Sequence, residues 1–243
     1  MPFYENYINE FKKLKNESLK VKLSHILTYY WIPIAIILFV LFFLVSMIVH
    51  YATRKDAALS IHCINAVYQT QASDQFLSDA EQKLGIDSST SEIAFANSPL
   101  TRDDVYTQVT IHQQIAAKLT SHSMDFLVSD VLFLLQYAYN GAFCDIRTVL
   151  SPEQAEALSP YFLYMDQALA DKFATAEEAT PEIPDPTAPE KMDSPIPIAL
   201  QIPKDSAFDK LYYSHTENII AIAVIKNPPH MAKAAQFLSL LYE

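Results

Sequence analysis

The chain has only two glycines among its 243 residues, Gly85 and Gly141, and each follows a stretch with helical spacing. Average proteins contain roughly 7% glycine, so the shortage is unusual. Both glycines fall where a helix ends in the left-handed conformation that glycine adopts most readily. None is left for a G-x-G-x-x-G turn, a phosphate-binding P-loop or a G-x-S-x-G nucleophile elbow. The sequence therefore argues against enzymes built on those motifs.

Side chains that bind metals or form disulfides are also scarce. The only cysteines are Cys63 and Cys144, both in apolar surroundings. Spacing cannot show whether they lie close together, so a disulfide and two buried thiols are both open. No two of the seven histidines have the H-x-x-x-H spacing of metal ligands. His112 lies beside the apolar stripe of a predicted helix, where a packing role is the more common one. We predict no metal site and no cofactor.

Basic residues are few in the larger part of the chain. Residues 56–243 carry 10 basic and 25 acidic side chains, a net charge of −15. Nucleic acids are bound mostly through Lys and Arg that neutralise phosphates, so we expect no nucleic-acid partner. The same charge disfavours this part lying flat on an anionic membrane. For a domain outside the cytoplasm, a large negative charge ordinarily serves only solubility.

One long apolar run, YWIPIAIILFVLFFLVSMIVHY at 30–51, contains no Lys, Arg, Asp or Glu. Roughly 20 residues of helix cross the hydrocarbon layer of a bilayer, so the run is long enough to span it. A cleaved signal peptide is the alternative, but its apolar core is typically shorter and precedes a small-residue cleavage site. We predict a retained signal anchor. Its one transmembrane helix would hold the protein in the membrane.

The flanking lysines predict the orientation of this anchor. Residues 1–29 contain five lysines, whereas only Arg54 and Lys55 lie close on the other side. The positive-inside rule then places residues 1–29 in the cytoplasm, as a juxtamembrane segment, and residues 56–243 outside the cell membrane. Helical spacing within 1–28 predicts a short amphipathic helix, marked by Phe3, Tyr7, Phe11 and Leu14.

The outer part alternates between strand and helix patterns. Strands are expected at 59–68, 91–96, 124–128, 198–202 and 219–225, and helices after Ser73, at 101–121, at 131–140, after Ser151 and at 230–242. Strands that are apolar on both faces are typical of parallel sheets covered by helices. The fold class is therefore predicted as α/β, with a mostly parallel sheet and helices on both faces.

An acidic, proline-rich segment interrupts this pattern. Residues 174–197 contain six prolines and six acidic residues but only one lysine. Such composition disfavours packed elements, so we predict a linker or a long exposed loop there.

Polar residues follow three of the predicted strands. They are Tyr68 and Gln69 after the first strand, Asn97 and Ser98 after the second, and Ser129 and Asp130 after the third. Open α/β sheets bind ligands at the ends of their strands, which makes these six residues candidates for a binding site. The alternative for Asp130 is that it only caps the helix that follows.

Two stretches resemble a known family. The run IHQQIAAKLTSHSMDFLVSDVLFLLQYAYNGAFCDIRTVLSPEQ contains a "-D-hydrophobic-D-" strand from Asp125 to Asp130, a helix, a turn from Gly141 that reads GAFCD and is similar to a family pattern "G-aromatic-hydrophobic-D", and a Ser-capped helix. The C-terminal ENIIAIAVIKNPPHMAKAAQFLSLLYE has the pattern of a returning strand, a turn and a closing helix. Both are similar to extracellular solute-binding proteins with the type II periplasmic-binding fold.

This resemblance implies one lobe of that fold, because only about residues 160–197 are available for the second lobe that the family inserts. A reduced, membrane-anchored relative of this kind is expected to be an accessory or protein-interaction module at the cell surface, with a membrane or envelope protein as partner. The alternative is a receptor that binds a small solute for a transporter or sensor. A third hypothesis, an envelope hydrolase, lacks a recognisable nucleophile, base or metal set.

Overall fold

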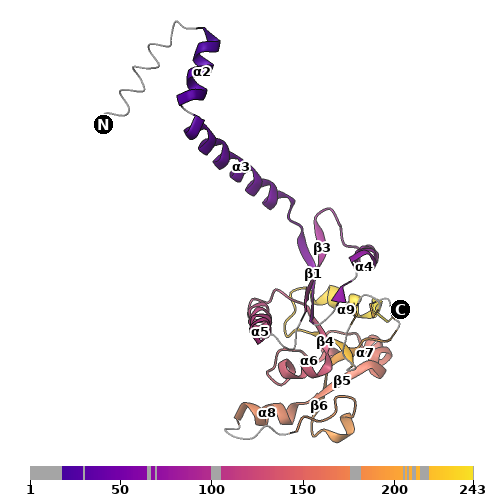
Figure 1. The fold of residues 1–243 in the computed structure, drawn as a ribbon. Helices are drawn as coiled ribbons and strands as arrows, with labels where there is room; N and C mark the ends of the chain where they lie inside the picture. Colours follow the sequence, from indigo (N-terminus) through magenta and orange to yellow (C-terminus); the bar gives the residue numbers. More distant parts are fainter. Residues whose placement is uncertain are drawn as a thin grey trace. The chain divides into compact units, whose positions relative to one another are not determined.

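The computed structural model describes residues 18–29, 31–64, 67–68, 70–99, 105–175, 182–204, 206, 208–209, 212–213 and 219–242. The chain divides into two compact units, Met1–Arg54 and Lys55–Glu243 (Figure 1). Three sequence expectations lie outside the described residues: the helix pattern before residue 18, the candidate Gln69 and the first residues, 101–104, of the helix expected at 101–121.

In the first unit, the described residues form helices α2 (Leu19–Tyr29) and α3 (Trp31–Thr53). The 23 residues of α3 include no Asp, Glu, Lys or Arg, and none of its side chains is buried. At 1.5 Å per residue the helix is about 35 Å long, against roughly 30 Å for the hydrocarbon core of a bilayer. A helix long and apolar enough to span a membrane is therefore present where the sequence predicts it.

The second unit is built on a six-stranded sheet with the order β3-β1-β4-β8-β6-β5. The strands are β1 (Asp56–Ile64), β3 (Ser91–Ser98), β4 (Phe126–Asp130), β5 (Phe162–Asp166), β6 (Pro195–Gln201) and β8 (Ile220–Val224). Strand β1 pairs in parallel with β3 and β4, whereas β8 pairs antiparallel with β4 and β6, and β5 pairs antiparallel with β6.

The prediction of a mostly parallel sheet is therefore wrong, because the sheet is mixed. Strand β8 is apolar on both faces and was for that reason expected to be parallel. It lies instead between β4 and β6, antiparallel to both, with helices covering both of its faces. Two-sided burial gives the same apolar pattern whatever the direction of the neighbouring strands.

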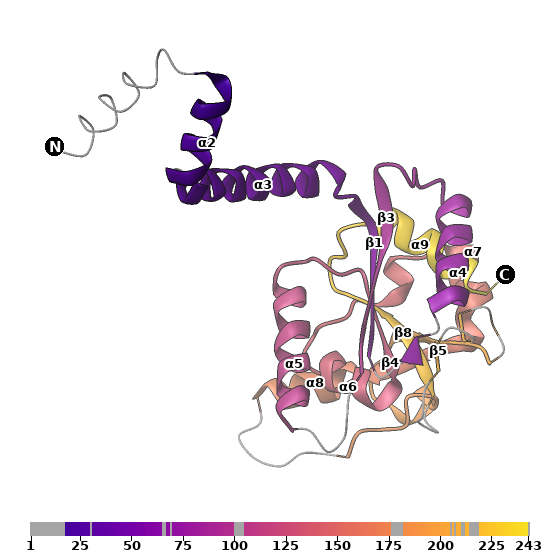
Figure 2. The ribbon, with the colours of Figure 1, turned by 45° about the horizontal axis from the view of Figure 1, so that its top comes forward.

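Helices cover both faces of this sheet, as predicted (Figure 2). One core holds Ala80, Leu158 and Phe237, from α4 (Thr70–Lys83), α7 (Pro152–Leu158) and α9 (Met231–Leu240). The other core holds Ile111, Leu134 and Ala170, from α5 (Val105–Thr120), α6 (Val131–Ala138) and α8 (Gln167–Thr175). Strand residues alternate between the two cores, so that Phe126 packs in the first and Leu127 in the second.

Signals local to the chain predict several helix ends correctly. Gly85 and Gly141 have φ angles of +61° and +71° and follow α4 and α6. Ser151 starts α7 with a complete capping box that includes Gln154. The helix expected after Ser73 begins earlier, at Thr70, so that Ser73 is buried inside α4.

The predicted strand at 59–68 is two separate strands. Strand β1 ends at Ile64, and β2 (Val67–Tyr68) pairs antiparallel with β7 (Tyr212–Tyr213) in a second, two-stranded sheet. The two cysteines are free, so the structure favours thiols over a disulfide. Cys63 is fully buried, and burial raises the pKa of its thiol, so that it packs as a small apolar side chain.

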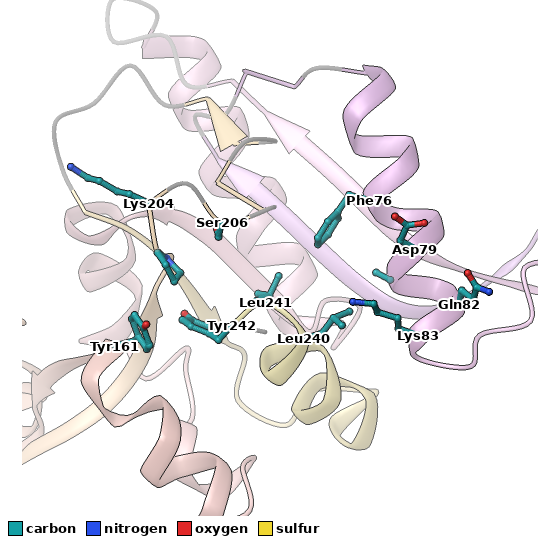
Figure 3. Close-up of a pocket in the computed structure, with 12 residues that line it drawn as sticks. Phe76, Asp79, Gln82, Lys83, Tyr161, Lys204, Ser206, Leu240, Leu241 and Tyr242 are labelled. Atoms are coloured by element: carbon teal, nitrogen blue, oxygen red, sulfur yellow. The ribbon is translucent and has the colours of Figure 1, made fainter.

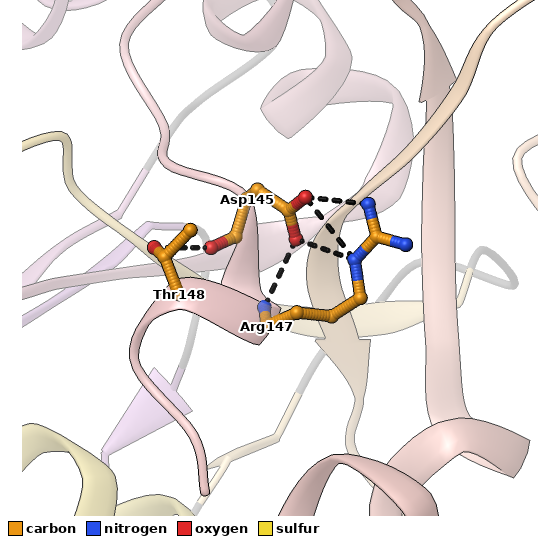
Figure 4. Close-up of polar contacts among 3 residues, drawn as sticks. All are labelled: Asp145, Arg147 and Thr148. Atoms are coloured by element: carbon orange, nitrogen blue, oxygen red, sulfur yellow. Dashed lines mark hydrogen bonds and ion pairs between the residues drawn. The ribbon is translucent and has the colours of Figure 1, made fainter. Parts of the chain in front are cut away.

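A tight turn follows α6 and matches the expected turn between Gly141 and Leu150. Asp145 caps a 3₁₀ helix, η2 (Ile146–Thr148), and accepts a hydrogen bond from the Thr148 hydroxyl on its backbone carbonyl at 2.7 Å. The Arg147 guanidinium donates to both carboxylate oxygens of Asp145, with Nε at 2.9 and 3.1 Å (Figure 4). This hydrogen bonding raises the pKa of Arg147. The turn is thus held by its own side chains.

The acidic, proline-rich segment is more ordered than its composition predicts. Helix α8 extends into it as far as Thr175, residues 176–181 lie outside the described part, and β6 begins at Pro195. Between them lies a 3₁₀ helix, η4 (Pro189–Lys191). The side chains of Pro186, Ala188 and Met192 are buried. The segment is therefore not a loop throughout, because residues 174–175 belong to α8 and residues 195–197 to β6, whereas most residues from 187 to 194 are exposed.

Asp166, at the end of β5, explains this order. Its buried carboxylate accepts hydrogen bonds of 3.0 Å from the backbone N–H groups of Ala168, Asp193 and Ser194. Burial alone would raise the pKa of this carboxyl, but the backbone N–H groups of Asp193, Ser194 and Ala168 outweigh it and lower the pKa. One side chain thus starts α8 and fastens the end of the segment to the sheet.

Candidate functional site

The three parallel strands end at one edge of the sheet, called here the carboxyl edge. In the register, Ile64 of β1 faces Ser98 of β3, and Cys63 faces Val128 of β4. The last residues of all three strands therefore lie together, as the sequence predicts for Asn97, Ser98, Ser129 and Asp130. Tyr68 continues the chain from β1, and only its backbone pairing with Tyr212 is described.

Asp130 caps helix α6. Its side chain accepts a hydrogen bond from the Phe133 backbone N–H at 3.1 Å, and its backbone is extended, with φ −63° and ψ 150°. The capping interpretation is therefore confirmed. The carboxylate is used within the fold, at the start of the helix.

Ser129 is fully buried on the face of β4 that also carries Leu127. Its hydroxyl has no hydrogen-bond partner among the described residues. Strand β8 covers it on one side, because Ser129 faces Ala221 in the register. The side chain thus points into the packed second core rather than toward an opening, which disfavours direct contact with a solute.

A polar cluster that the sequence did not suggest lies beside these residues. His62 of β1 has its Nε2 atom 3.1 Å from the Ser98 hydroxyl and its Nδ1 atom 2.7 Å from the amine of Lys118 on α5. Only 3% of His62 is exposed. Burial, aided by the charge of Lys118, lowers the pKa of His62 to about 4, and burial also lowers the pKa of Lys118. His62 is consequently a neutral imidazole at physiological pH.

The tautomer of His62 determines what this cluster can do. A lysine ammonium only donates hydrogen bonds, so Nδ1 accepts from Lys118 and the ring proton sits on Nε2. Nε2–H then donates to the Ser98 hydroxyl. A serine nucleophile needs the opposite arrangement, in which the imidazole accepts the serine proton. The geometry leaves Ser98 without a general base and gives the cluster a structural role at the carboxyl edge.

His112 packs in the way the sequence suggests. Its ring stacks on Phe133 with centroids 5.4 Å apart, and its Nδ1 atom lies 2.5 Å from the Tyr137 hydroxyl. Within the described residues, no three His, Cys, Asp or Glu side chains are grouped in a way that could hold a metal ion.

The carboxyl edge carries an open groove, called here the edge groove. Its volume is about 470 Å³. It is lined by the first turns of α6, by the segment before η4 and by the residue that precedes β8, namely Val131, Leu132, Leu135, Ile183, Pro184, Asp185, Pro186 and Ile219. Two of these apolar side chains are well exposed, Leu132 at 56% and Ile183 at 43%. Asp185 is the one charged residue in the lining.

The edge groove was not predicted from the sequence. Leu132 lies in an α6 sequence that is apolar nearly all round, where no contrast between faces shows which side stays exposed. Ile183 lies in the segment expected to be a linker. Comparison of the chain with protein-family models, with curated proteins and with solved structures finds no match.

Proposed function

We propose that this chain is a single-pass membrane-anchored accessory protein whose α/β domain, outside the cytoplasm, binds a protein partner through the edge groove. The observation that carries the proposal is the exposed aliphatic lining of this groove, with Leu132 and Ile183 at its surface. Exposed apolar side chains that gather in one groove are typical of protein interaction sites.

The anchor and its orientation rest on α3 and on its flanks. The helix has the length and composition of a membrane span, and five lysines precede it. The positive-inside rule then favours a cytoplasmic N-terminus and a domain at the outer surface of the cell membrane. The net charge of −15 over residues 56–243 suits a soluble domain in that location.

The order of the strands supports a relationship to one lobe of the type II periplasmic-binding fold. Strand β8 returns from near the C-terminus to the middle of the sheet, and α9 packs over the sheet after it, as the resemblance implies. Residues 162–201 add β5, α8 and β6 to the same unit instead of building a second lobe. A solute could not be enclosed between two lobes, which favours a protein partner.

The strand-end residues give less support to the alternative, a small-solute receptor at the carboxyl edge. Asp130 caps α6, Ser98 bonds to His62, and Ser129 is buried in the core. None of these side chains lines the edge groove. Alanine substitution of Ser129 or Asp130 that left affinity for a bound solute unchanged would count against this alternative.

Site-specific photocrosslinking in intact membranes tests the proposed partner contact. A benzoyl-phenylalanine placed at Leu132 should give one discrete crosslinked product. Adding Ile183→Asp should reduce that product at least tenfold, because a charge in the groove must be desolvated on binding. Both residues are exposed, so the variants should remain within about 0.5 kcal/mol of the parent in stability.

Met231, at the start of α9, provides the matched control, because it is a large apolar side chain with 46% exposure outside the groove. A crosslinker at Met231 should not give the product seen at Leu132. If both positions give the same product, or if Ile183→Asp leaves the yield at Leu132 unchanged, the edge groove is not the binding surface.

A further inference from the structure

A larger cavity lies on the sheet face that carries the first core, between α4 and the C-terminal end of α9 (Figure 3). We call it the α4–α9 pocket. Its volume is about 700 Å³, within the range of roughly 300–1,000 Å³ that is usual for small-molecule sites. It is lined by Phe76, Asp79, Ala80, Gln82, Lys83, Tyr161, Pro203, Lys204, Ser206, Leu240, Leu241 and Tyr242.

The apolar walls of this pocket are fixed by contacts within the fold. The Phe76 ring meets the rings of Phe208 and Phe237 edge to face, with centroids 5.7 and 6.5 Å apart. The rings of Tyr161 and Tyr242 lie 4.7 Å apart. Such pairs hold side chains in one arrangement, so a ligand that packs on them loses little of its binding free energy to ordering the walls.

Tyr242 is held in place at its polar end as well. Its hydroxyl donates a hydrogen bond of 2.7 Å to the backbone carbonyl of Gln201, and burial raises its pKa. The ring therefore remains neutral and presents an apolar surface beside Tyr161. Together with the side chains of Leu240 and Leu241, these rings give the pocket an apolar base (Figure 3).

Two opposite charges stand on one side of the pocket. Asp79 and Lys83 are four residues apart on α4, which places them on the same helix face. Both are exposed. Figure 3 shows them across the pocket from Tyr161, with Phe76 and Leu240 between, while the amine of Lys204 points away in this view. An anion and a cation thus adjoin an aromatic and aliphatic surface.

We propose that the α4–α9 pocket binds a short peptide that carries an aromatic or large aliphatic side chain. The apolar side chain packs against Phe76 and Leu240. The peptide carboxylate pairs with Lys83, and its free ammonium pairs with Asp79. A compound with only negative charge would be repelled by Asp79 and by a domain whose net charge is −15.

The size of the pocket favours a peptide over a single amino acid, whose volume would leave much of the 700 Å³ empty. The inference does not depend on the proposed partner at the edge groove. The lining of the α4–α9 pocket shares no residue with that groove. Either site can therefore fail in a test without affecting the other.

Tryptophan fluorescence gives a direct test, because Trp31 is the only tryptophan in the chain. The full-length protein with Trp31→Phe, in detergent micelles, is then silent under excitation of tryptophan alone. The probe is the tripeptide Ala-Trp-Ala, titrated against micelles with and without protein. We expect a saturable blue shift that requires the protein, since the indole moves from water to an apolar surface.

The charged residues provide the decisive comparison. Lys83→Glu should weaken binding of Ala-Trp-Ala at least tenfold, but it should have little effect on the peptide with a C-terminal amide, which lacks the carboxylate. Lys226→Glu makes the same charge change on an exposed lysine that is not in the pocket lining. It should leave the affinity within twofold.

Three results would overturn the proposal. One is the absence of a saturable, protein-dependent shift up to millimolar peptide. Another is an equal loss of affinity in Lys83→Glu and Lys226→Glu, which would indicate a general effect of charge. The third is equal binding of the amidated and the free peptide to the Trp31→Phe protein, which would show that the carboxylate makes no contact.

Discussion

Replacing Asp125 with alanine should destabilise the domain by about 3–5 kcal/mol, because it removes the buried acceptor of three hydrogen bonds, and each buried donor left unsatisfied costs about 1–3 kcal/mol. The side chain of Asp125 is fully buried. One carboxylate oxygen accepts from the backbone N–H of Ser60 at 2.8 Å and from Nδ1 of His230 at 2.9 Å, and the other accepts from the backbone N–H of His230 at 2.8 Å. Alanine leaves all three donors without their acceptor.

The position of these donors explains the size of the expected loss. Ser60 lies in β1, Asp125 directly precedes β4, and His230 directly precedes α9. One side chain therefore joins three segments that are up to 170 residues apart in the sequence. Domains are usually stable by only 5–15 kcal/mol, so the variant should be close to unfolding at moderate temperature.

Urea unfolding of residues 55–243, which contain both cores, measures the effect. His230→Ala should lose less than Asp125→Ala, because it removes the ring contact but keeps the backbone N–H. Asp171→Ala, at an exposed position on α8, should stay within about 0.5 kcal/mol of the parent. A loss in Asp125→Ala as small as that in Asp171→Ala would mean that the three bonds contribute little.

Asp125 also shows how far the sequence predicts this structure. The family resemblance includes the strand between Asp125 and Asp130, and the side chains of both residues accept backbone hydrogen bonds. The two residues differ in how far away their partners lie in the sequence. Asp130 bonds three residues ahead, and such caps can be predicted from the local sequence. Asp125 bonds to residues 65 and 105 positions away, and no local pattern indicates those partners.

The same distinction explains the errors in the fold. Helix ends at Gly85, Gly141 and Ser151 follow from local backbone preferences, and they were predicted. Strand direction depends on where the chain returns to the sheet, so β8 was expected to be parallel. The segment before β6 has the composition of an exposed loop, but the Asp166 carboxylate binds its backbone from outside the segment. Composition cannot show such a contact.

The sequence predicts that the ends of the parallel strands lie at one edge of the sheet, but it predicts neither the edge groove nor the contacts of the strand-end side chains. Because β3 and β4 both run parallel to β1, Ser98 and Asp130 lie at the same edge of the sheet, and this placement does not depend on the surrounding side chains. The use of those side chains depends on neighbours such as Lys118, which lies 56 residues beyond His62 in the sequence. The sequence offers one signal for this polar cluster, which is the single histidine His62 between the apolar residues Ile61 and Cys63.

His62 should make the domain lose stability as the pH falls from 6.5 toward 4. The folded domain holds this imidazole neutral, with a pKa lowered to about 4, whereas the unfolded chain protonates it near its ordinary value of 6.5. Between these values the unfolded state binds more protons, so the free energy of unfolding rises with pH. Above pH 6.5 His62 is neutral in both states, and the free energy of unfolding keeps its full value. The two pKa values imply that the free energy of unfolding is lower by about 3 kcal/mol once the pH reaches 4.

Unfolding free energies of the parent domain and of His62→Gln, measured at several pH values between 4 and 7.5, isolate this contribution. Glutamine is uncharged and can still accept from Lys118, so the variant should lose stability less steeply in acid. Lys118→Met should retain most of the parent slope, because burial lowers the pKa of His62 more than the charge of Lys118 does. If His62→Gln and the parent have parallel pH profiles, His62 is not held neutral by the fold, and the tautomer that leaves Ser98 without a base would no longer follow.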